Sequence, residues 1–167
     1  MKFALVPWSL DFVDDVARYA DNPAVARNLR DAFPNPYTRE DARDYIEACI
    51  AREGQGQLCR AIVLDGEAVG SVGVFVGDDV YRKSAGLGYW LAEPFWGRVI
   101  MTEAVRRICA EAFARFDVVR IHAEPYARNK GSRRVLEKAG FVLEGTLKKS
   151  VYKNGELLDS CIYALLR

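Results

Sequence analysis

The sequence is poor in the residues that build metal and redox sites. Its 167 residues contain a single histidine, His122, and the four cysteines form no CxxC pair and have no histidine at ligand spacing. Metal and thiol-redox motifs need such close pairs. We therefore expect no metal site and four buried, reduced thiols, at Cys49, Cys59, Cys109 and Cys161. His122 lies within the apolar pattern Val118 to Ala123, which favours a structural histidine over a catalytic base.

The sequence also lacks an excess of charge and a long apolar segment. It has 24 Lys and Arg against 23 Asp and Glu, so nothing in its net charge predicts a nucleic-acid or anionic-membrane partner. The first segment, Met1 to Leu10, is apolar only briefly before Asp11, Asp14 and Asp15 follow. This pattern fits neither a signal peptide nor a membrane span, and we expect a cytoplasmic protein.

No repeat, low-complexity tract or Pro/Gly-rich linker divides the chain, and its length suits one domain over residues 1–167. A capping box at Thr38 to Asp41 predicts a helix start, and the pairs Asp65-Gly66 and Asn154-Gly155 predict hairpin turns. Apolar patterns predict strands at Met1–Trp8, Leu58–Leu64, Ala68–Val76, Ala85–Ala92, Val118–Glu124, Val142–Tyr152 and Leu158–Leu166. With helices at Met101–Phe116 and Ser132–Lys138, the order β-αα-βββ-α-β-α-ββ describes one mixed α/β sheet with helices on both faces.

Two strand-to-helix segments carry the functional signal. Gly88 to Val105 runs from an apolar strand through a short turn into a helix, whose first backbone N–H groups can receive a phosphate. Asn129 to Phe141 is a second such segment, which closes on Gly140-Phe141. Its Asn129 is suited to cap the helix, and Ser132 falls in the first helical turn.

Together the two segments resemble the acetyl-CoA-binding core of the GNAT acyltransferases. The resemblance implies the GNAT fold, a central mixed sheet splayed in the middle, and an acetyl-CoA-dependent N-acetyltransferase. It implies that a backbone amide at a bulge in the first strand polarises the thioester carbonyl. By the same resemblance, the cofactor-binding residues are Leu91, Ala92, Trp96, Gly97, Arg98, Val99, Ile100, Met101, Thr102, Asn129 and Ser132.

Val99 departs from the family pattern, which has glycine at this position. Glycine permits positive φ and close approach of a phosphate, whereas a β-branched residue resists both. If the backbone is left-handed at Val99, we expect weakened cofactor binding; if it is an ordinary helix start, the Val99 N–H still donates.

The resemblance implies direct transfer from acetyl-CoA to an amine in a ternary complex, with no metal. Many relatives use a tyrosine acid at the position of Leu136, so Ser132 is the candidate acid. Glu93 is the first candidate for a water-linked base and Glu124 the second. A plain contact of Glu93 with the helix dipole is the structural alternative.

The acceptor side resembles the ribosomal-protein N-acetyltransferase branch of the family. The resemblance rests on Asn28 to Thr38 with Asp41-Ala42, on Gly140-Phe141-x-x-Glu144-Gly145, and on Tyr152-x-x-Gly155-x-x-x-Asp159. It implies a protein or peptide N-terminal α-amine as acceptor and the acceptor-binding residues Arg30, Phe33, Asn35, Tyr37 and Tyr89. The aromatic residues are equally explained by packing, and Arg30 by a solvated helix end.

Two other functions remain open at the level of sequence. The acceptor is a small amine such as a polyamine, amino sugar or antibiotic if the pocket is deep and acidic, and a peptide if it is an open groove. Alternatively, Val99 and Leu136 mark a vestigial or regulatory CoA-binding domain. The apolar terminal segment Cys161 to Leu166 would, as an edge strand, allow pairing across a homodimer.

Overall fold

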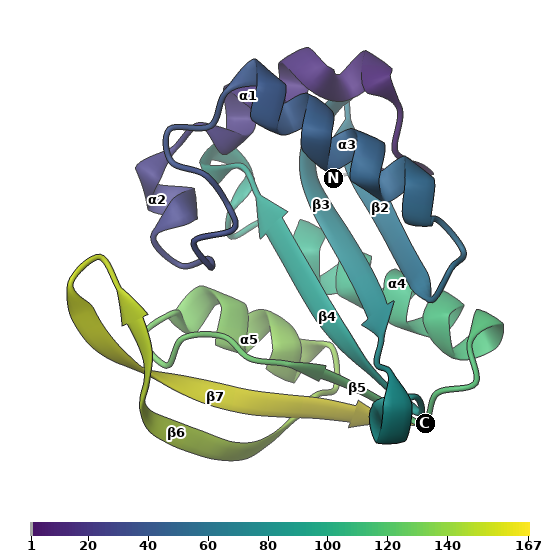
Figure 1. The fold of residues 1–167 in the computed structure, drawn as a ribbon, viewed down its shortest axis with the longest axis vertical. Coiled ribbons are helices and arrows are strands. Elements are labelled where there is room, and N and C mark those ends of the chain that lie inside the picture. The colour runs from purple at the N-terminus through teal and green to yellow at the C-terminus, as the bar shows by residue number, and fades with distance from the viewer. Residues whose placement is uncertain (1) are drawn as a thin grey trace.

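The computed structural model describes residues 2–167, which form one seven-stranded sheet with helices on both faces (Figure 1). The strand order is β1-β2-β3-β4-β5-β7-β6. The strands are β1 (Ala4–Pro7), β2 (Gln57–Leu64), β3 (Glu67–Val76), β4 (Ser84–Leu91), β5 (Arg120–Ala123), β6 (Val142–Lys153) and β7 (Glu156–Leu166). The helices are α1 (Val13–Ala20), α2 (Pro23–Ala26), α3 (Arg39–Arg52), α4 (Ile100–Arg115) and α5 (Lys130–Lys138), and 3₁₀ turns lie at Leu10–Phe12, Asp79–Tyr81 and Glu93–Phe95. The predicted mixed α/β sheet is confirmed.

Local sequence signals explain several element boundaries. The Thr38 and Asp41 side chains form the predicted capping box at the start of α3. The β2–β3 and β6–β7 hairpins turn at Asp65-Gly66 and Asn154-Gly155, where both residues of each pair have positive φ. The first strand is shorter than predicted, because only Ala4–Pro7 pairs with β2; Met1 lies outside the described residues.

The two faces of the sheet carry separate apolar clusters. Helices α1 and α3 cover one face, where Trp8, Val16 and Ile46 are buried. Helix α4 covers the other face with Val105 and Ile108, and α5 joins the same layer (Figure 1). Apolar side chains therefore pack against both faces of the sheet near its centre. The candidate functional site lies at this centre.

The centre of the sheet is splayed. Strands β4 and β5 form the parallel pair, but they are paired only from Ser84↔Arg120 to Gly86↔His122. Beyond Gly86, β4 continues to Leu91 against β3, while β5 ends at Ala123. Figure 1 shows the two strands diverging from this point. The predicted splayed sheet is thus confirmed, and β5 is shorter than predicted because its neighbour moves away.

The prediction that Cys161 to Leu166 is an exposed edge strand is wrong. Strand β7 pairs with β5 on one side and with β6 on the other, so both of its edges are already hydrogen-bonded. The strand at this edge of the sheet is β6. No helix within residues 2–167 is both long enough and apolar enough to cross a lipid bilayer.

Candidate functional site

A continuous groove opens where β4 and β5 diverge, with a volume of about 1530 Å³. This volume exceeds the roughly 300–1,000 Å³ of a pocket for one drug-sized ligand. The groove runs from the start of α4 past β4 and α5 to the α2–α3 segment and β6. It therefore has room for a long cofactor at one end and an acceptor at the other.

The start of α4 presents backbone N–H groups that could bind an anion. The first intrahelical hydrogen bond runs from Glu103 N–H to Val99 O, which leaves the N–H groups of Ile100 to Thr102 without helical partners. Gly97 and Val99 both have positive φ, 73° and 65°, so the turn before the helix is a concave stretch of backbone amides. No side chain within the described part of the chain caps this helix start.

Val99 is therefore in the left-handed conformation, with φ 65° and ψ −1°. The loop has kept the backbone geometry that a glycine would supply, although a β-branched residue occupies it. The Val99 side chain is 63% exposed and points away from the packed core. Under the sequence-based hypothesis, this geometry predicts weakened cofactor binding, which stays a prediction.

The free edge of β4 forms one wall of the groove. The Ala92 N–H donates to Val69 O on β3, so strand alternation turns the backbone groups of Tyr89 and Leu91 toward the open side. The Leu91 carbonyl there accepts a hydrogen bond of 2.7 Å from Trp96 Nε1. The expected bulge in β4 is not found, because its register with β3 is unbroken from Val76↔Ala85 to Gly70↔Leu91. Divergence from β5, rather than a bulge, frees these amides.

Tyr89 and Ser132 meet across the groove. The Tyr89 Oη lies 2.5 Å from Ser132 Oγ, although the residues are 43 positions apart. Ser132 is held in the first turn of α5, where its N–H donates to Asn129 Oδ1 at 3.2 Å. Burial raises the pKa of Tyr89 to about 12 in spite of the hydrogen bond to Ser132. A protonated phenol therefore supports the serine hydroxyl at neutral pH.

Leu136 does not take part in this arrangement. It is fully buried in the core beneath α5, together with Ile121 and Tyr163. The side chain at the position of the family's tyrosine thus packs into the core.

The candidate bases are separated by the structure. Glu93 is the first residue of the 3₁₀ turn after β4; it is exposed and does not line the groove. Glu124 lines the groove, as does His122 two residues before it, where β4 and β5 separate. Burial lowers the pKa of His122, so its imidazole is neutral at pH 7. Of the two predicted bases, Glu124 therefore lines the groove and Glu93 does not, and the neutral His122 is a further basic group there.

The predicted acceptor-binding residues are mostly brought together. Arg30, Phe33 and Tyr37 line the same end of the groove. The rings of Phe33 and Tyr37 also pack against each other, with centroids 5.0 Å apart. Both residues therefore pack together and line the groove as well. Burial raises the pKa of Tyr37 well above its usual value. Asn35 lies outside the groove, in a smaller cavity with Asp31 and Lys153.

Of the predicted cofactor residues, only Ala92 lies outside the groove. It is fully buried, because its N–H is tied to β3 and its side chain faces the core. The remaining predicted residues line the groove from the end of β4 to the start of α5, namely Leu91, Trp96, Gly97, Arg98, Val99, Ile100, Met101, Thr102, Asn129 and Ser132.

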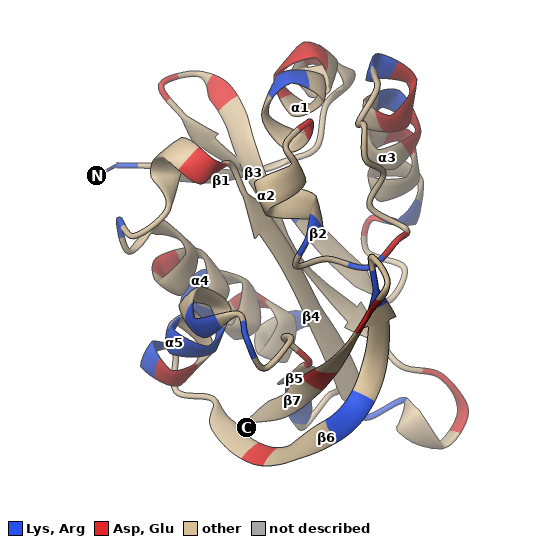
Figure 2. Cartoon of the chain, turned by 90° about the vertical axis from the view of Figure 1, so that its left-hand side faces the viewer, with Lys and Arg blue, Asp and Glu red and all other residues tan. Residues whose placement is uncertain are grey.

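Several lining residues were missed from the sequence. Arg134 and Lys138, four residues apart on one face of α5, add positive charge near the anion site of α4, and Figure 2 shows basic residues along this helix. Their spacing on the second motif's helix could have identified them. Asn28 also lines the groove, and its buried Oδ1 has no hydrogen-bond partner among residues 2–167.

Comparisons with a family model and with curated proteins both indicate an acetyltransferase family. Residues 2–142 match the family described as Acetyltransferase (GNAT) domain. The chain is 31% identical over 150 residues to the "Putative ribosomal N-acetyltransferase YdaF" of Bacillus subtilis (strain 168), covering 89% of this chain and 75% of YdaF. It is 24% identical over 127 residues to the ribosomal-protein-serine acetyltransferase of Escherichia coli (strain K12), covering 76% and 71% of the two chains.

Solved structures have the same fold. RimL, a ribosomal L7/L12 α-N-protein acetyltransferase in complex with coenzyme A, superposes with a TM-score of 0.88 at 24% identity, covering 99% of this chain and 94% of RimL. Mycobacterium smegmatis RimJ in complex with CoA-disulfide superposes with a TM-score of 0.86 at 26% identity, covering 98% of this chain and 81% of RimJ.

Proposed function

Because the chain belongs to the GNAT acetyltransferase family, we propose that it transfers the acetyl group of acetyl-CoA to the N-terminal α-amine of a protein or peptide. One observation carries the proposal: a single groove joins the open N-terminus of α4 to the paired hydroxyls of Tyr89 and Ser132. The former suits a pyrophosphate and the latter a departing thiolate. Relatives named as ribosomal N-acetyltransferases support the acceptor.

The cofactor would lie along the β4 side of the groove. The N–H groups of Ile100 to Thr102 would bind its pyrophosphate, assisted by Arg98 and by Arg134 and Lys138 on α5. Backbone N–H groups of Tyr89 and Leu91, at the free edge of β4, would donate to the thioester carbonyl. When bound, acetyl-CoA supplies an activated acetyl group and a thiolate leaving group.

Two proton transfers would fall to the chain's own residues, one from the attacking amine and one to the departing thiolate. Glu124, with His122 behind it, would accept the proton of the attacking amine through a water. Ser132 would donate a proton to the departing sulfur and regain one from Tyr89, whose phenol is 2.5 Å away and would be reprotonated from solvent water. Both donors are held by regular structure, Ser132 by the cap of α5 and Tyr89 by β4.

The acceptor end favours a peptide over a polyamine. Arg30, Asp41 and Asp44 all line the groove, so its charge is mixed, whereas a polyamine site would be mainly acidic. The groove also continues to Ser150 and Tyr152 on β6, beyond the residues that would hold a single amine.

The first test is calorimetric titration with acetyl-CoA, followed by transfer assays. We expect micromolar binding and then a mass gain of one acetyl group on peptides with a free N-terminus. Matched peptides blocked at the N-terminus but carrying an internal lysine should remain unmodified. Transfer only to spermidine or amino sugars would move the acceptor to small amines. Absence of acetyl-CoA binding would instead identify a vestigial domain.

The pH profile of kcat/KM should follow the ionisation of the acceptor amine and not that of Tyr89. An α-amine attacks only when neutral, so kcat/KM should rise about tenfold per pH unit up to about pH 8 and then level off. Since the pKa of Tyr89 is raised to about 12, its acid form persists across this range. We therefore expect no decline up to about pH 10. A falling limb below pH 10 in a kcat/KM profile would contradict the assigned protonated phenol.

A further inference from the structure

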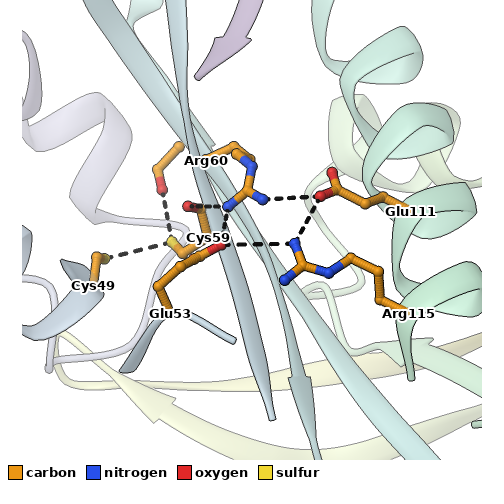
Figure 3. A network of polar contacts seen from close by, with 7 residues as sticks. Cys49, Glu53, Cys59, Arg60, Glu111 and Arg115 are labelled. Atoms are coloured by element: carbon orange, nitrogen blue, oxygen red, sulfur yellow. Dashed lines mark hydrogen bonds and ion pairs between the residues drawn. The ribbon is translucent and has the colours of Figure 1, made fainter. Parts of the chain in front are cut away.

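Two cysteines from different elements meet at the acceptor end of the groove. Cys49 on α3 and Cys59 on β2 place their sulfur atoms 3.5 Å apart (Figure 3). Both thiols are buried and free, as predicted, and Cys59 is one of the residues that line the groove, so the groove is the route by which a small oxidant would reach it. Ten residues separate them in sequence, a spacing that fits no known thiol motif.

The surroundings of Cys59 favour its thiolate. Its sulfur lies 3.5 Å from the hydroxyls of both Tyr45 and Ser71, which are themselves 2.7 Å apart. Hydrogen bonding from Cys49, and then from Tyr45 and Ser71, lowers the pKa of Cys59 against the opposing effect of burial. The indole of Trp8, whose buried N–H has no hydrogen-bond partner within residues 2–167, also lowers the pKa of Cys59. Hydrogen bonding to Cys59 and burial raise the pKa of Cys49.

An ion-pair network holds the two elements in register. Arg60, next to Cys59, pairs with Glu53 at 2.6 Å and with Glu111 at 2.9 Å, and Arg115 links the same two carboxylates (Figure 3). Glu53 follows the last residue of α3 directly. These ion pairs therefore connect the C-terminal end of α3 to β2 and α4, and the network lies next to the two thiols.

We propose that Cys49 and Cys59 are an oxidation site that a hydroperoxide converts into an intrachain disulfide. The Cys59 thiolate attacks the peroxide: an S–O bond forms, the O–O bond breaks, and hydroxide leaves. Cys49 then attacks the resulting sulfenic sulfur: the S–S bond forms, the S–O bond breaks, and the Cys49 proton leaves with the hydroxide as water. With hydrogen peroxide as the hydroperoxide, the proton that Cys59 lost on forming its thiolate neutralises the first hydroxide. Both sulfurs are thus oxidised, and the peroxide is reduced to two waters.

Disulfide formation would change the acceptor end of the groove. The sulfurs must approach by about 1.5 Å to reach a bond of about 2.05 Å, which draws α3 toward β2. Tyr45 lies one helical turn before Cys49, and both Tyr45 and Ser71 line the groove. The disulfide itself does not depend on the proposed function, whereas its effect on the acceptor does.

The test is peptide mapping of the folded protein after exposure to hydrogen peroxide and alkylation of the remaining thiols. Trypsin cleaves after Arg43, Arg52 and Arg60, so Asp44–Arg52 and Glu53–Arg60 should appear as one disulfide-linked pair that dithiothreitol separates. Cys109 and Cys161 should be recovered alkylated. In transfer assays, oxidation should raise KM for the peptide at least about fivefold, with the affinity for acetyl-CoA unchanged.

Two variants complete the test. Cys49→Ala should abolish the linked peptide and leave Cys59 to oxidise to sulfinic acid, which dithiothreitol does not reverse. Cys109→Ala, which removes a buried thiol on α4, should retain the linked peptide. Recovery of all four thiols from the folded wild-type protein, or equal oxidation of all four, would overturn the proposal. If no transfer is ever detected, the peptide map still decides it.

Discussion

Replacing Ser132 by alanine should lower kcat about 10- to 100-fold while changing the Kd for acetyl-CoA by less than about twofold. The Ser132 Oγ stands where β4 and β5 diverge, and the proposed role is to donate to the departing thiolate. The Ser132 hydroxyl is therefore needed in the transition state and not for binding acetyl-CoA, so its removal should lower kcat and leave the Kd unchanged. Steady-state kinetics and calorimetric titration of the same preparation separate the two quantities.

Controls for this prediction are available in the chain. Ser84→Ala removes a hydroxyl at the far end of β4, outside the groove, and should leave kcat unchanged. An unchanged kcat in Ser132→Ala would reject Ser132 as the acid and leave a water in that role. A large rise in the Kd for acetyl-CoA would instead show that Ser132 acts in binding.

Tyr89 should act through Ser132 and not independently. Tyr89→Phe keeps the ring in β4 but removes the hydroxyl 2.5 Å from Ser132 Oγ, and should lower kcat about 3- to 10-fold. If the two hydroxyls form one relay, the double variant should be no slower than Ser132→Ala alone. Multiplicative losses would assign Tyr89 a separate role, such as contact with the acceptor.

The fold was largely predictable from the sequence because its signals are local. The capping box at Thr38, the turn at Asp65-Gly66 and the turn at Asn154-Gly155 each depend on two to four neighbouring residues. The end of α5 follows the same rule, since Gly140 has φ 96° and the Phe141 N–H returns to Leu136 O. The position of β7 was mistaken because strand order depends on the whole sheet.

The candidate site was predictable only where it follows one strand-to-helix segment. Residues from Trp96 to Thr102 were found because they are contiguous, and all of them line the groove. Glu93 was misplaced because adjacency in sequence does not show which residues of the turn Glu93–Phe95 line the groove; Phe95 does and Glu93 does not. The pairs Tyr89–Ser132 and Cys49–Cys59 join separate elements, and no spacing rule predicts either contact.

Replacing Val99 by glycine should raise the free energy of unfolding by a net of about 1–2 kcal/mol, because the left-handed backbone at φ 65° costs a β-branched residue about 2–3 kcal/mol. Glycine's greater freedom in the unfolded chain offsets about 0.5–1 kcal/mol of the relief. Little packing is lost, since the side chain is 63% exposed. Thermal unfolding should show a Tm higher by about 2–8 °C.

Val142→Gly is the matched control for this prediction. Val142 is similarly exposed, at 67%, but lies in the extended strand β6, so glycine there should lower stability by about 0.5–1 kcal/mol. The free energy of unfolding of Val99→Ala should lie between those of the wild-type protein and Val99→Gly, because alanine removes the β-branch but keeps the Cβ. A loss of stability in Val99→Gly equal to that in Val142→Gly would contradict strain at Val99.

The same variant decides whether Val99 limits the cofactor. If the folded loop already holds the left-handed geometry, the strain is a cost of folding, and Val99→Gly should change Tm while the Kd for acetyl-CoA stays within about threefold. If the loop reaches that geometry only on binding, the Kd should fall and Tm should not change. The backbone conformation at Val99 favours the first result, in which the valine weakens the fold and leaves the anion site intact.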